Sequence, residues 1–151
     1  MKLDSFLQAQ GIAFEKHHHA RSYTAQGLAH EEHVSGYLVA KPVVVIGAAG
    51  PAMCVLAAPK HLDLKRAAGV LNESEVRLAT ETELGNLCPD CDLGAEPPIG
   101  ALFGMRTVMD EGLQEDEFII MQAGTHTEAV KVRRADWERA CAPQIAPIAL
   151  D

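Results

Sequence analysis

The loop at residues 92–104, DLGAEPPIGALFG, places three glycines and two adjacent prolines around a single acidic residue. Its glycines, among them Gly94 and Gly100, permit positive φ and a close approach of the backbone to a ligand. The Pro97–Pro98 pair fixes the turn between them. Backbone N–H groups held in such a loop can stabilise the oxyanion that develops on a carbonyl group. A stiff connection between a helix and a strand is the alternative, and this segment alone favours it.

Two further stretches bring reactive side chains into play. Lys41 stands at the start of a predicted central strand, VAKPVVV, where its ammonium group would lie at the edge of a sheet beside a pocket. The stretch AGTHTEAVKV places a turn, Gly124-Thr125-His126, directly before another strand. A single lysine is usually solvated and a single histidine usually has no catalytic role, so only the combination with the loop indicates a site.

Other chemistries find less support in the sequence. No serine lies in G-x-S-x-G and there is no G-x-x-x-x-G-K-[ST], which disfavours a serine-triad enzyme and a P-loop. Cys88 and Cys91 have zinc-ligand spacing, and His30 and His33 lie one turn apart on a predicted helix. The zinc deaminase pattern has a proline directly before its first cysteine, and no proline precedes Cys88. A zinc protein is therefore the less favoured alternative.

The elements that must position these residues alternate between helices and strands. Apolar periodicity and capping signals predict helices at 2–10, 24–33, 61–71, 80–87 and 135–141, and strands at 12–17, 37–47, 53–58, 103–110, 117–124 and 128–133. Thr80 and Glu83 form a predicted capping box. The histidines at 17–19 are expected at the surface or at the rim of a site, and the proline-containing tail is expected to be loosely held. This order predicts one α+β domain with a mixed or largely antiparallel sheet.

Composition narrows the class of protein. With 151 residues, 48% hydrophobic and 23% charged, the chain has the size and balance of one globular domain. No secretory signal, membrane span or dense disulfide framework is apparent, so we expect a cytoplasmic protein. The formal net charge of −8 argues against wrapping nucleic acid over a broad surface but allows a grip on one nucleotide end. The basic clusters available for that grip are Lys60, His61, Lys65 and Arg66, and Lys131, Arg133 and Arg134.

Taken in order, VAKPVVV, DCDLGAEPPIGALFG and AGTHTEAVKV resemble the YbaK/prolyl-tRNA-synthetase-associated editing domain family, over about residues 24–132. Its motifs are a lysine entering a central strand, a G-x-x-x-P loop and a late glycine turn, and Gly94-Ala-Glu-Pro-Pro98 fits the second. The resemblance implies that residues 1–151 form a single α+β domain with a curved, mixed, barrel-like β-sheet and flanking helices.

The resemblance also implies an activity, which is hydrolysis in trans of mischarged aminoacyl-tRNA without a metal or other cofactor. Alanine, serine and cysteine on a non-cognate tRNA are plausible substrates. An aminoacyl ester is already activated, so positioning a water and stabilising the oxyanion can suffice, which accounts for the missing nucleophile. The implied partner is the tRNA acceptor end, with a synthetase as a further candidate, and no DNA or membrane partner is expected. A non-catalytic module that binds tRNA ends or a related small ligand is the main alternative.

Carried over residue by residue, the resemblance assigns roles. Lys41 is expected to hold the acceptor end through its terminal phosphates, and the backbone of Gly94–Pro98 is expected to hold the aminoacyl group and its carbonyl. Glu96 is expected to be incidental and to face solvent. Pro42 and Ile99 depart from the residues frequent in the family and bear on the substrate. The expected catalytic set is Lys41, Gly94 and His126, and the expected substrate-binding set is Tyr23, Thr24, Ala95, Pro97, Pro98, Gly100, Gly124 and Thr125.

Overall fold

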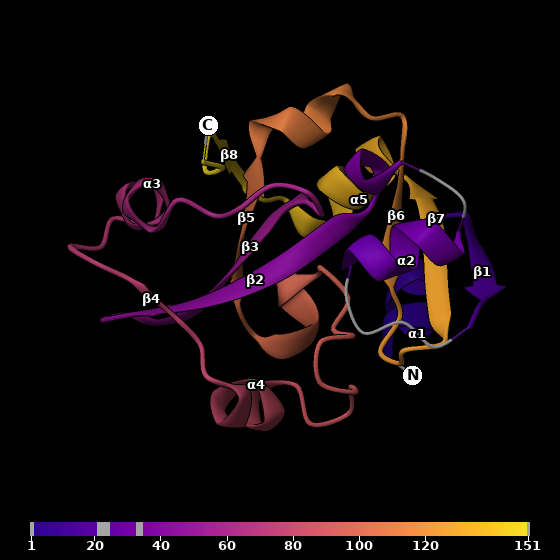
Figure 1. Ribbon diagram of the computed structural model, residues 1–151, viewed down its shortest axis with the longest axis horizontal. Helices are drawn as coiled ribbons and strands as arrows, with labels where there is room; N and C mark the ends of the chain where they lie inside the picture. The colour runs from indigo at the N-terminus through magenta and orange to yellow at the C-terminus, as the bar shows by residue number, and fades with distance from the viewer. Residues whose placement is uncertain (1, 21–24, 33–34, 151) are drawn as a thin grey trace.

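The computed structural model describes residues 2–20, 25–32 and 35–150 (Figure 1). Its larger sheet has five strands in the order β4-β2-β3-β5-β8. The hairpin of β2 and β3 is antiparallel, whereas β5 runs parallel to β3 and β8 runs parallel to β5. The strands are β2 (Ala40–Gly47), β3 (Gly50–Ala57), β4 (Arg77–Leu78), β5 (Arg106–Asp110) and β8 (Gln144–Ala146).

A smaller sheet lies beside the larger one and has the antiparallel order β1-β7-β6. Its strands are β1 (Phe14–His18), β6 (Phe118–Gln122) and β7 (Glu128–Arg133). An isolated parallel bridge between Val39 and Ile120 connects β2 and β6. The prediction of an α+β fold with mixed strands is therefore confirmed, but the two sheets do not close into a barrel.

Helices flank these sheets. In Figure 1, α3 and α4 lie at the side of the larger sheet, and α1 and α2 lie near the smaller one. The helices α2 and α5 both pack against β6. The α-helices are α1 (Lys2–Ala9), α2 (Ala25–Glu31), α3 (Leu64–Val70), α4 (Glu81–Leu87) and α5 (Arg134–Cys141), and the 3-10 helices are η1 (Gly36–Leu38), η2 (Gly100–Phe103) and η3 (Glu111–Glu115). None of the helices among the described residues is long and apolar enough to cross a membrane.

The start of α4 follows from the local chemistry of its capping residues. Thr80 caps α4, and its hydroxyl accepts from the Glu83 N–H while the Glu83 carboxylate accepts from the Thr80 N–H. This confirms the predicted capping box. Thr24, the predicted cap of α2, and His33, its predicted end, lie outside the described residues.

The main core fills the space between the two sheets. Met53 and Met109 from the larger sheet, Met121 from the smaller one and Trp137 of α5 belong to one buried cluster. Full burial of one such side chain contributes roughly 1.5–3 kcal/mol. The indole N–H of Trp137 donates to the carbonyl of Pro98 at 2.9 Å, so this core also anchors the proline pair of the loop.

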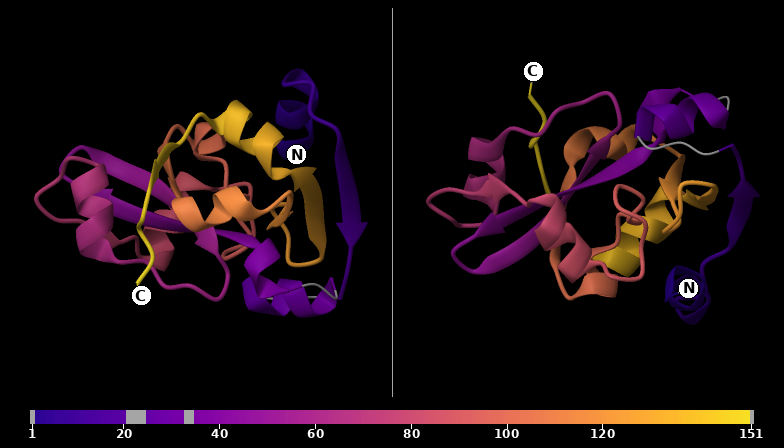
Figure 2. Two further views of the ribbon diagram at one scale, coloured as in Figure 1. Left: turned by 90° about the horizontal axis from the view of Figure 1, so that it is seen from above. Right: turned by 60° about the horizontal axis from the view of Figure 1, so that its bottom comes forward.

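The C-terminal segment corrects one prediction, because it is not loosely held. After α5 the chain runs extended across the molecule (Figure 2) and adds β8 beside β5. Ile148 is fully buried in a second core cluster, and its N–H donates to the carboxylate of Asp110 at 3.1 Å. Asp110 is only 3% exposed, and this carboxylate needs such donors. The tertiary environment therefore orders a segment whose local pattern is weak.

The histidine run lies along and just beyond β1. The His17 ring contacts the carboxylates of Glu32 and Glu15, whereas His18 is exposed. The hydrogen bond to Glu32 raises the pKa of His17 above its ordinary value, against the opposing effect of burial. His17 thereby links β1 to the residue that follows α2.

Candidate functional site

A cavity of about 300 Å³ lies where the two sheets part. The strands β2 and β6 meet at the parallel bridge between Val39 and Ile120, and Lys41 and Gln122 each lie two residues beyond it. Because side chains two residues apart point to the same face of a strand, these two are placed together, and both line the cavity. The remaining lining residues are Ala40, Pro42, Val43, Val44, Leu78, Ala79, Leu84, Gly94 and Glu96.

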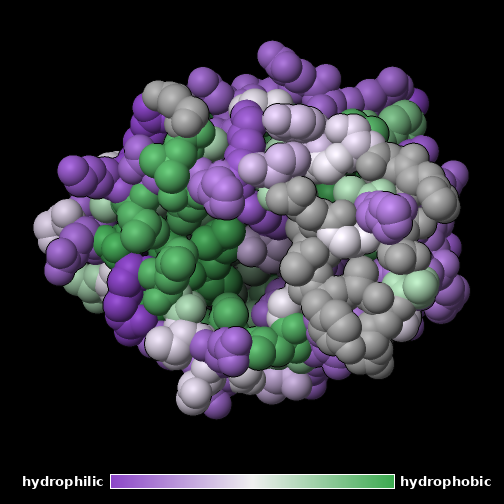
Figure 3. Space-filling view, viewed as in Figure 1, coloured by the Kyte–Doolittle hydropathy of each residue, from purple (hydrophilic) through white to green (hydrophobic). Residues whose placement is uncertain are grey.

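The outer wall of this cavity is apolar. Hydrophobic side chains gather over β2 and β4 in Figure 3. Leu78 is 54% exposed there, on a strand that pairs with β2 only at Val45 and Ile46. Pro42 lies outside that short pairing, at a stretch of β2 that β4 does not reach. A polar inner end and an apolar wall suit a small ligand with one charged and one apolar part.

The glycine-proline loop is bonded to the turn between β6 and β7. The carbonyl of Ala95 accepts from the Gly124 N–H at 2.9 Å, and the Asp92 N–H donates to the Gly124 carbonyl at 2.8 Å. The Asp92 carboxylate also accepts from the His126 N–H at 3.3 Å. The structure thus brings together the two stretches, far apart in sequence, that were singled out for their chemistry.

Two glycines of the loop have the positive φ that the sequence analysis allowed, Gly94 at +85° and Gly104 at +69°. In the turn, Gly124 has φ of +97°, and residues other than glycine rarely adopt this region. Gly100 serves packing, because its N–H donates to the Thr107 hydroxyl at 3.1 Å and a Cβ would meet the Thr107 side chain and the Met105 carbonyl. Within the described residues, no peptide bond is cis.

Most N–H groups of the loop are used within the protein. The Gly94 N–H donates to the Glu96 carboxylate at 3.2 Å, and the Ala95 N–H donates to the Asp92 carbonyl at 3.0 Å. Proline has no N–H at all. Among the residues that the structure describes, the Glu96 N–H has no acceptor.

The position of Glu96 differs from the one that the sequence predicts. It is 5% exposed and lines the cavity with Lys41, so the expectation that it faces solvent is wrong. The physical reason is the turn, which folds the carboxylate back onto the Gly94 N–H. Its negative charge acts on the neighbouring thiols: burial, and then this charge, raise the pKa of Cys88 to about 12 and that of Cys91 to about 11.

Lys41 lies half-buried at the inner end of the cavity. Its ammonium group donates to the Ala58 carbonyl at 3.0 Å. Burial lowers the pKa of Lys41 below its ordinary value of 10.5. An ammonium group has three donors, so two remain for the oxygens of a ligand.

Within the described part of the chain, none of the predicted substrate-binding residues lines the cavity that holds Lys41 and Gly94. Pro97, Gly124 and Thr125 line a second cavity of about 560 Å³, together with apolar residues such as Phe103. Ala95 is fully buried between the loop and the turn. The carbonyl of Pro98 is taken by Trp137, and His126 is 7% exposed. Tyr23 and Thr24 lie outside the described residues.

The cysteine pair does not make a convincing metal site. Across residues 2–20, 25–32 and 35–150, no three or more His, Cys, Asp or Glu side chains are grouped so as to hold a metal ion. Zinc binds the thiolate, and burial raises the pKa of both Cys88 and Cys91, so a metal bound there would have to offset the cost of ionising two partly buried thiols. His30 is exposed, and His33 lies outside the described part of the chain.

Comparison with known proteins places this geometry in a family. Residues 19–140 match the family model of the aminoacyl-tRNA editing domain. The chain belongs to this family. No curated protein sequence matches it significantly. The membership supports a function in aminoacyl-tRNA editing and confirms the resemblance inferred from the motifs.

Solved structures of the same fold are similar along the whole chain. Hypothetical protein APE2540 is 19% identical with a TM-score of 0.91, over 99% of this chain and 100% of that one. A protein provisionally described as a trans-editing enzyme for prolyl-tRNA synthetase is 20% identical with a TM-score of 0.85, over 99% and 96% of the two chains. Likeness at these identities establishes the fold alone.

Sequence reasoning did not single out Gln122. It ends the run FIIMQ, in which the preceding residues are apolar and three of them are buried. The available signal was a polar residue closing an otherwise apolar strand just before the Gly124 turn. Its proximity to Lys41 depends on the bridge between β2 and β6, which no local pattern predicts.

Proposed function

We propose that this protein is a free-standing deacylase that hydrolyses mischarged aminoacyl-tRNA in trans, without a metal, and that residues 1–151 form one such domain. The observation that carries the proposal is the meeting of Lys41 with the Gly94–Glu96 segment in one cavity, in a chain of the editing domain family. The volume of about 300 Å³ suits a small aminoacyl group such as alanyl, seryl or cysteinyl. We place the protein in the cytoplasm, where its tRNA substrate would be found.

The chain's own groups supply the steps of this hydrolysis. Lys41 binds acceptor-end oxygens through its two remaining donors, which fixes the ester at the cavity. The Glu96 N–H donates to the carbonyl oxygen, on which negative charge develops as water adds. The bond between the carbonyl carbon and the ribose oxygen then breaks, and the proton from water passes to that ribose oxygen. The products are a free amino acid and an uncharged tRNA.

His126 does not line the cavity of Lys41, but the turn that carries it is hydrogen-bonded to the glycine-proline loop. The His126 N–H is fixed by the Asp92 carboxylate, and Asp92 also bonds to Gly124, so the turn and the loop hold each other in place. We propose that this rigid junction keeps the loop donors aligned, and that His126 contributes to substrate handling beside it. The preorganised donors then need no rearrangement when charge develops.

The likeness to a protein described as acting for prolyl-tRNA synthetase suggests the first substrates to try. Single-turnover deacylation should be measured with alanyl, seryl and cysteinyl groups on tRNA specific for proline, and with correctly charged prolyl-tRNA as the matched control. We expect hydrolysis of at least one mischarged species well above the spontaneous rate. Tight binding of every species without turnover would identify a non-catalytic module instead and refute the proposal.

A further inference from the structure

Gln122 carries a polar atom without a partner inside the cavity. The side chain is 6% exposed, and its Oε1 is buried with no hydrogen-bond donor among the residues that the structure describes. Buried polar atoms in folded proteins are nearly always paired. An acceptor held in this way beside Lys41 indicates that its donor comes from a ligand.

Glu96 presents a second acceptor to the same cavity. One of its carboxylate oxygens accepts from the Gly94 N–H at 3.2 Å, and within the described residues the other oxygen has no donor. No Lys or Arg nitrogen in the described part of the chain lies within salt-bridge distance of it. The ammonium group of Lys41 is directed to the Ala58 carbonyl instead. A carboxylate that is 5% exposed and lacks a cation is suited to a cationic ligand group.

We propose that Glu96 and Gln122 bind the α-ammonium group of the aminoacyl moiety. This inference rests on the proposed function. In an aminoacyl ester, one carbon atom separates the ammonium group from the carbonyl, so their binding sites must be adjacent. Glu96 meets this condition within one residue, because its backbone N–H is left for the carbonyl oxygen and its side chain supplies the acceptor for the ammonium group. Gln122 adds the second acceptor from β6.

The consequence is selectivity at the amino group. An ester whose nitrogen is acylated, as in peptidyl-tRNA, has lost both the positive charge and two of the three N–H donors. Its neutral amide would leave the Glu96 carboxylate desolvated and unpaired, which is strongly unfavourable. The protein should therefore spare N-acylated esters while it hydrolyses free aminoacyl esters.

The experiment compares one aminoacyl-tRNA with its N-acetylated form in single-turnover deacylation. The variants are Glu96→Gln and Gln122→Leu, which keep the side-chain volume, and the matched controls are the exposed Glu75→Gln and Gln10→Leu. Loss of one charge-assisted hydrogen bond corresponds to about 10–150-fold in rate. We expect each cavity variant to lose that much on the free aminoacyl-tRNA and little on the already slow N-acetylated form. The ratio of the two rates should fall toward one, and the controls should keep the wild-type ratio.

Equal losses on both substrates in a folded variant, or an unchanged ratio, would overturn the assignment. Melting temperatures distinguish a folding defect from a loss of substrate binding. Gln122→Leu removes an unpaired buried atom and should not destabilise the protein. If the wild type hydrolyses no aminoacyl-tRNA, the proposed function fails and the inference is tested by calorimetry with alanylamino-adenosine, a stable amide analogue of the acceptor end. Binding that N-acetylation and Glu96→Gln both abolish would support the ammonium site, and equal or absent binding of the two analogues would refute it.

Discussion

The ammonium group of Lys41 is half-buried at a cavity and has a single protein acceptor, the Ala58 carbonyl. Removing it leaves that carbonyl without a donor but empties no core. We expect Lys41→Ala to lower the single-turnover rate of deacylation about 10–150-fold, the value of one charge-assisted hydrogen bond. The melting temperature should hardly change. Lys41→Arg should not restore the rate, because a planar guanidinium cannot copy a compact ammonium group.

The matched control for Lys41 is Arg139→Ala, which removes an exposed cation of α5 that belongs to neither basic cluster. It should behave like the wild type in both measurements. A folded Lys41→Ala protein that hydrolyses mischarged tRNA at the normal rate would remove this residue from the site.

Gly94 is the residue at which loop geometry and activity are most closely tied. At φ of +85°, an alanine would be strained whatever space it finds, and the strain would shift the neighbouring Glu96 N–H. We expect Gly94→Ala to lower the melting temperature and also to slow the folded fraction in single-turnover deacylation. A matched control is Gly85→Ala in the middle of α4, where a Cβ meets nothing within 4 Å and should stabilise by about 0.5–1 kcal/mol.

The competing description of the loop, a purely structural connector, predicts a different pair of results for Gly94→Ala. Stability would fall while the folded fraction turned over normally. Thermal unfolding measured beside single-turnover deacylation therefore decides whether the loop acts on substrate.

Among the elements, α4 offers a prediction that depends on pH. The Glu83 carboxylate accepts from both Nη atoms of Arg77, at 2.7 and 2.9 Å, and from the Thr80 N–H. These bonds lower its pKa from 4.5 to about 2. The folded state thus favours the ionised form, so the contribution to stability is complete above pH 4.5 and is lost as the pH falls toward 2.

Chemical unfolding of Glu83→Gln across this pH range tests the cap. The variant should be less stable than the wild type at neutral pH, and the difference should vanish near pH 2. Both side chains are accessible to solvent, 57% for Arg77 and 33% for Glu83, so the effect should be modest. Glu75→Gln serves as the control, and a difference between wild type and Glu83→Gln that stays constant with pH would mean that the bonds do not persist in solution.

Elements with a local signal could be predicted from the sequence, and those formed by distant contacts could not. The capping box predicts α4, and the continuous apolar runs at residues 43–46 and 53–58, separated by a Gly-Pro turn, predict the hairpin of β2 and β3. By contrast, β8 has three residues with little burial of its own and forms because β5 offers a free edge. The burial of Glu96 escaped prediction for a similar reason, since residues of β2 and β6 that are distant in the sequence line the same cavity.

At the scale of the whole molecule, the candidate site is a product of how two sheets meet. The motifs predicted Lys41, the Gly94 loop and the Gly124 turn one by one, and the structure joins the loop to the turn by backbone hydrogen bonds. Gln122 enters the site only because β2 and β6 touch at one bridge and then part. Such a contact links residues some eighty positions apart in the chain, and no short-range pattern encodes it.

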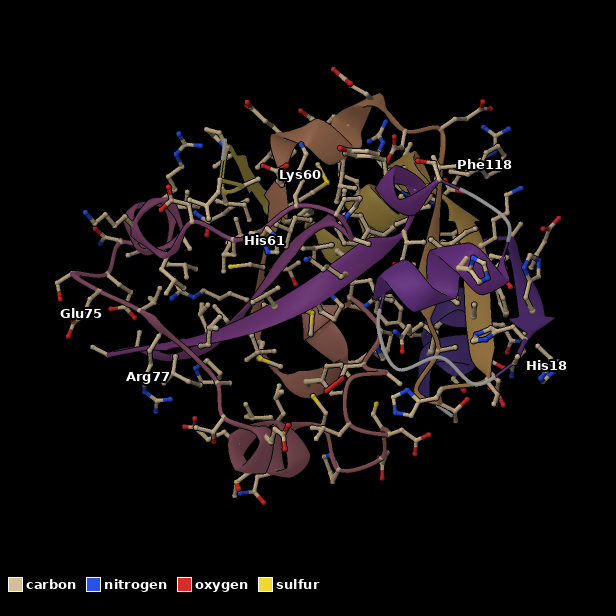
Figure 4. All side chains as sticks on the ribbon, in the orientation of Figure 1. His18, Lys60, His61, Glu75, Arg77 and Phe118 are labelled. Atoms are coloured by element: carbon tan, nitrogen blue, oxygen red, sulfur yellow. The ribbon has the colours of Figure 1, made fainter. Side chains whose placement is uncertain are left out.

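The surface of the whole molecule also limits how a tRNA can approach. With a net charge of −8, long-range attraction to phosphates is weak, so binding must depend on local cations. In Figure 4, Lys60 and His61 lie together after β3, far from Phe118, whose ring is contacted by Lys131 and Arg133. The carboxylate of Asp110 lies 3.4 Å from the Lys60 ammonium group. This charge distribution fits the proposal that the protein grips only the acceptor end.

The whole protein should also work without a bound metal, because the described residues contain no group of three or more His, Cys, Asp or Glu side chains placed to hold one. Exhaustive chelation should leave deacylation unchanged, and so should the double substitution Cys88→Ser, Cys91→Ser in protein that remains folded. Cys141→Ser is the control for replacing a thiol of similarly raised pKa elsewhere in the fold. Metal analysis of the purified protein completes the test: stoichiometric zinc, with activity lost on its removal and regained on its return, would overturn the metal-free mechanism and make the cysteine pair part of the site.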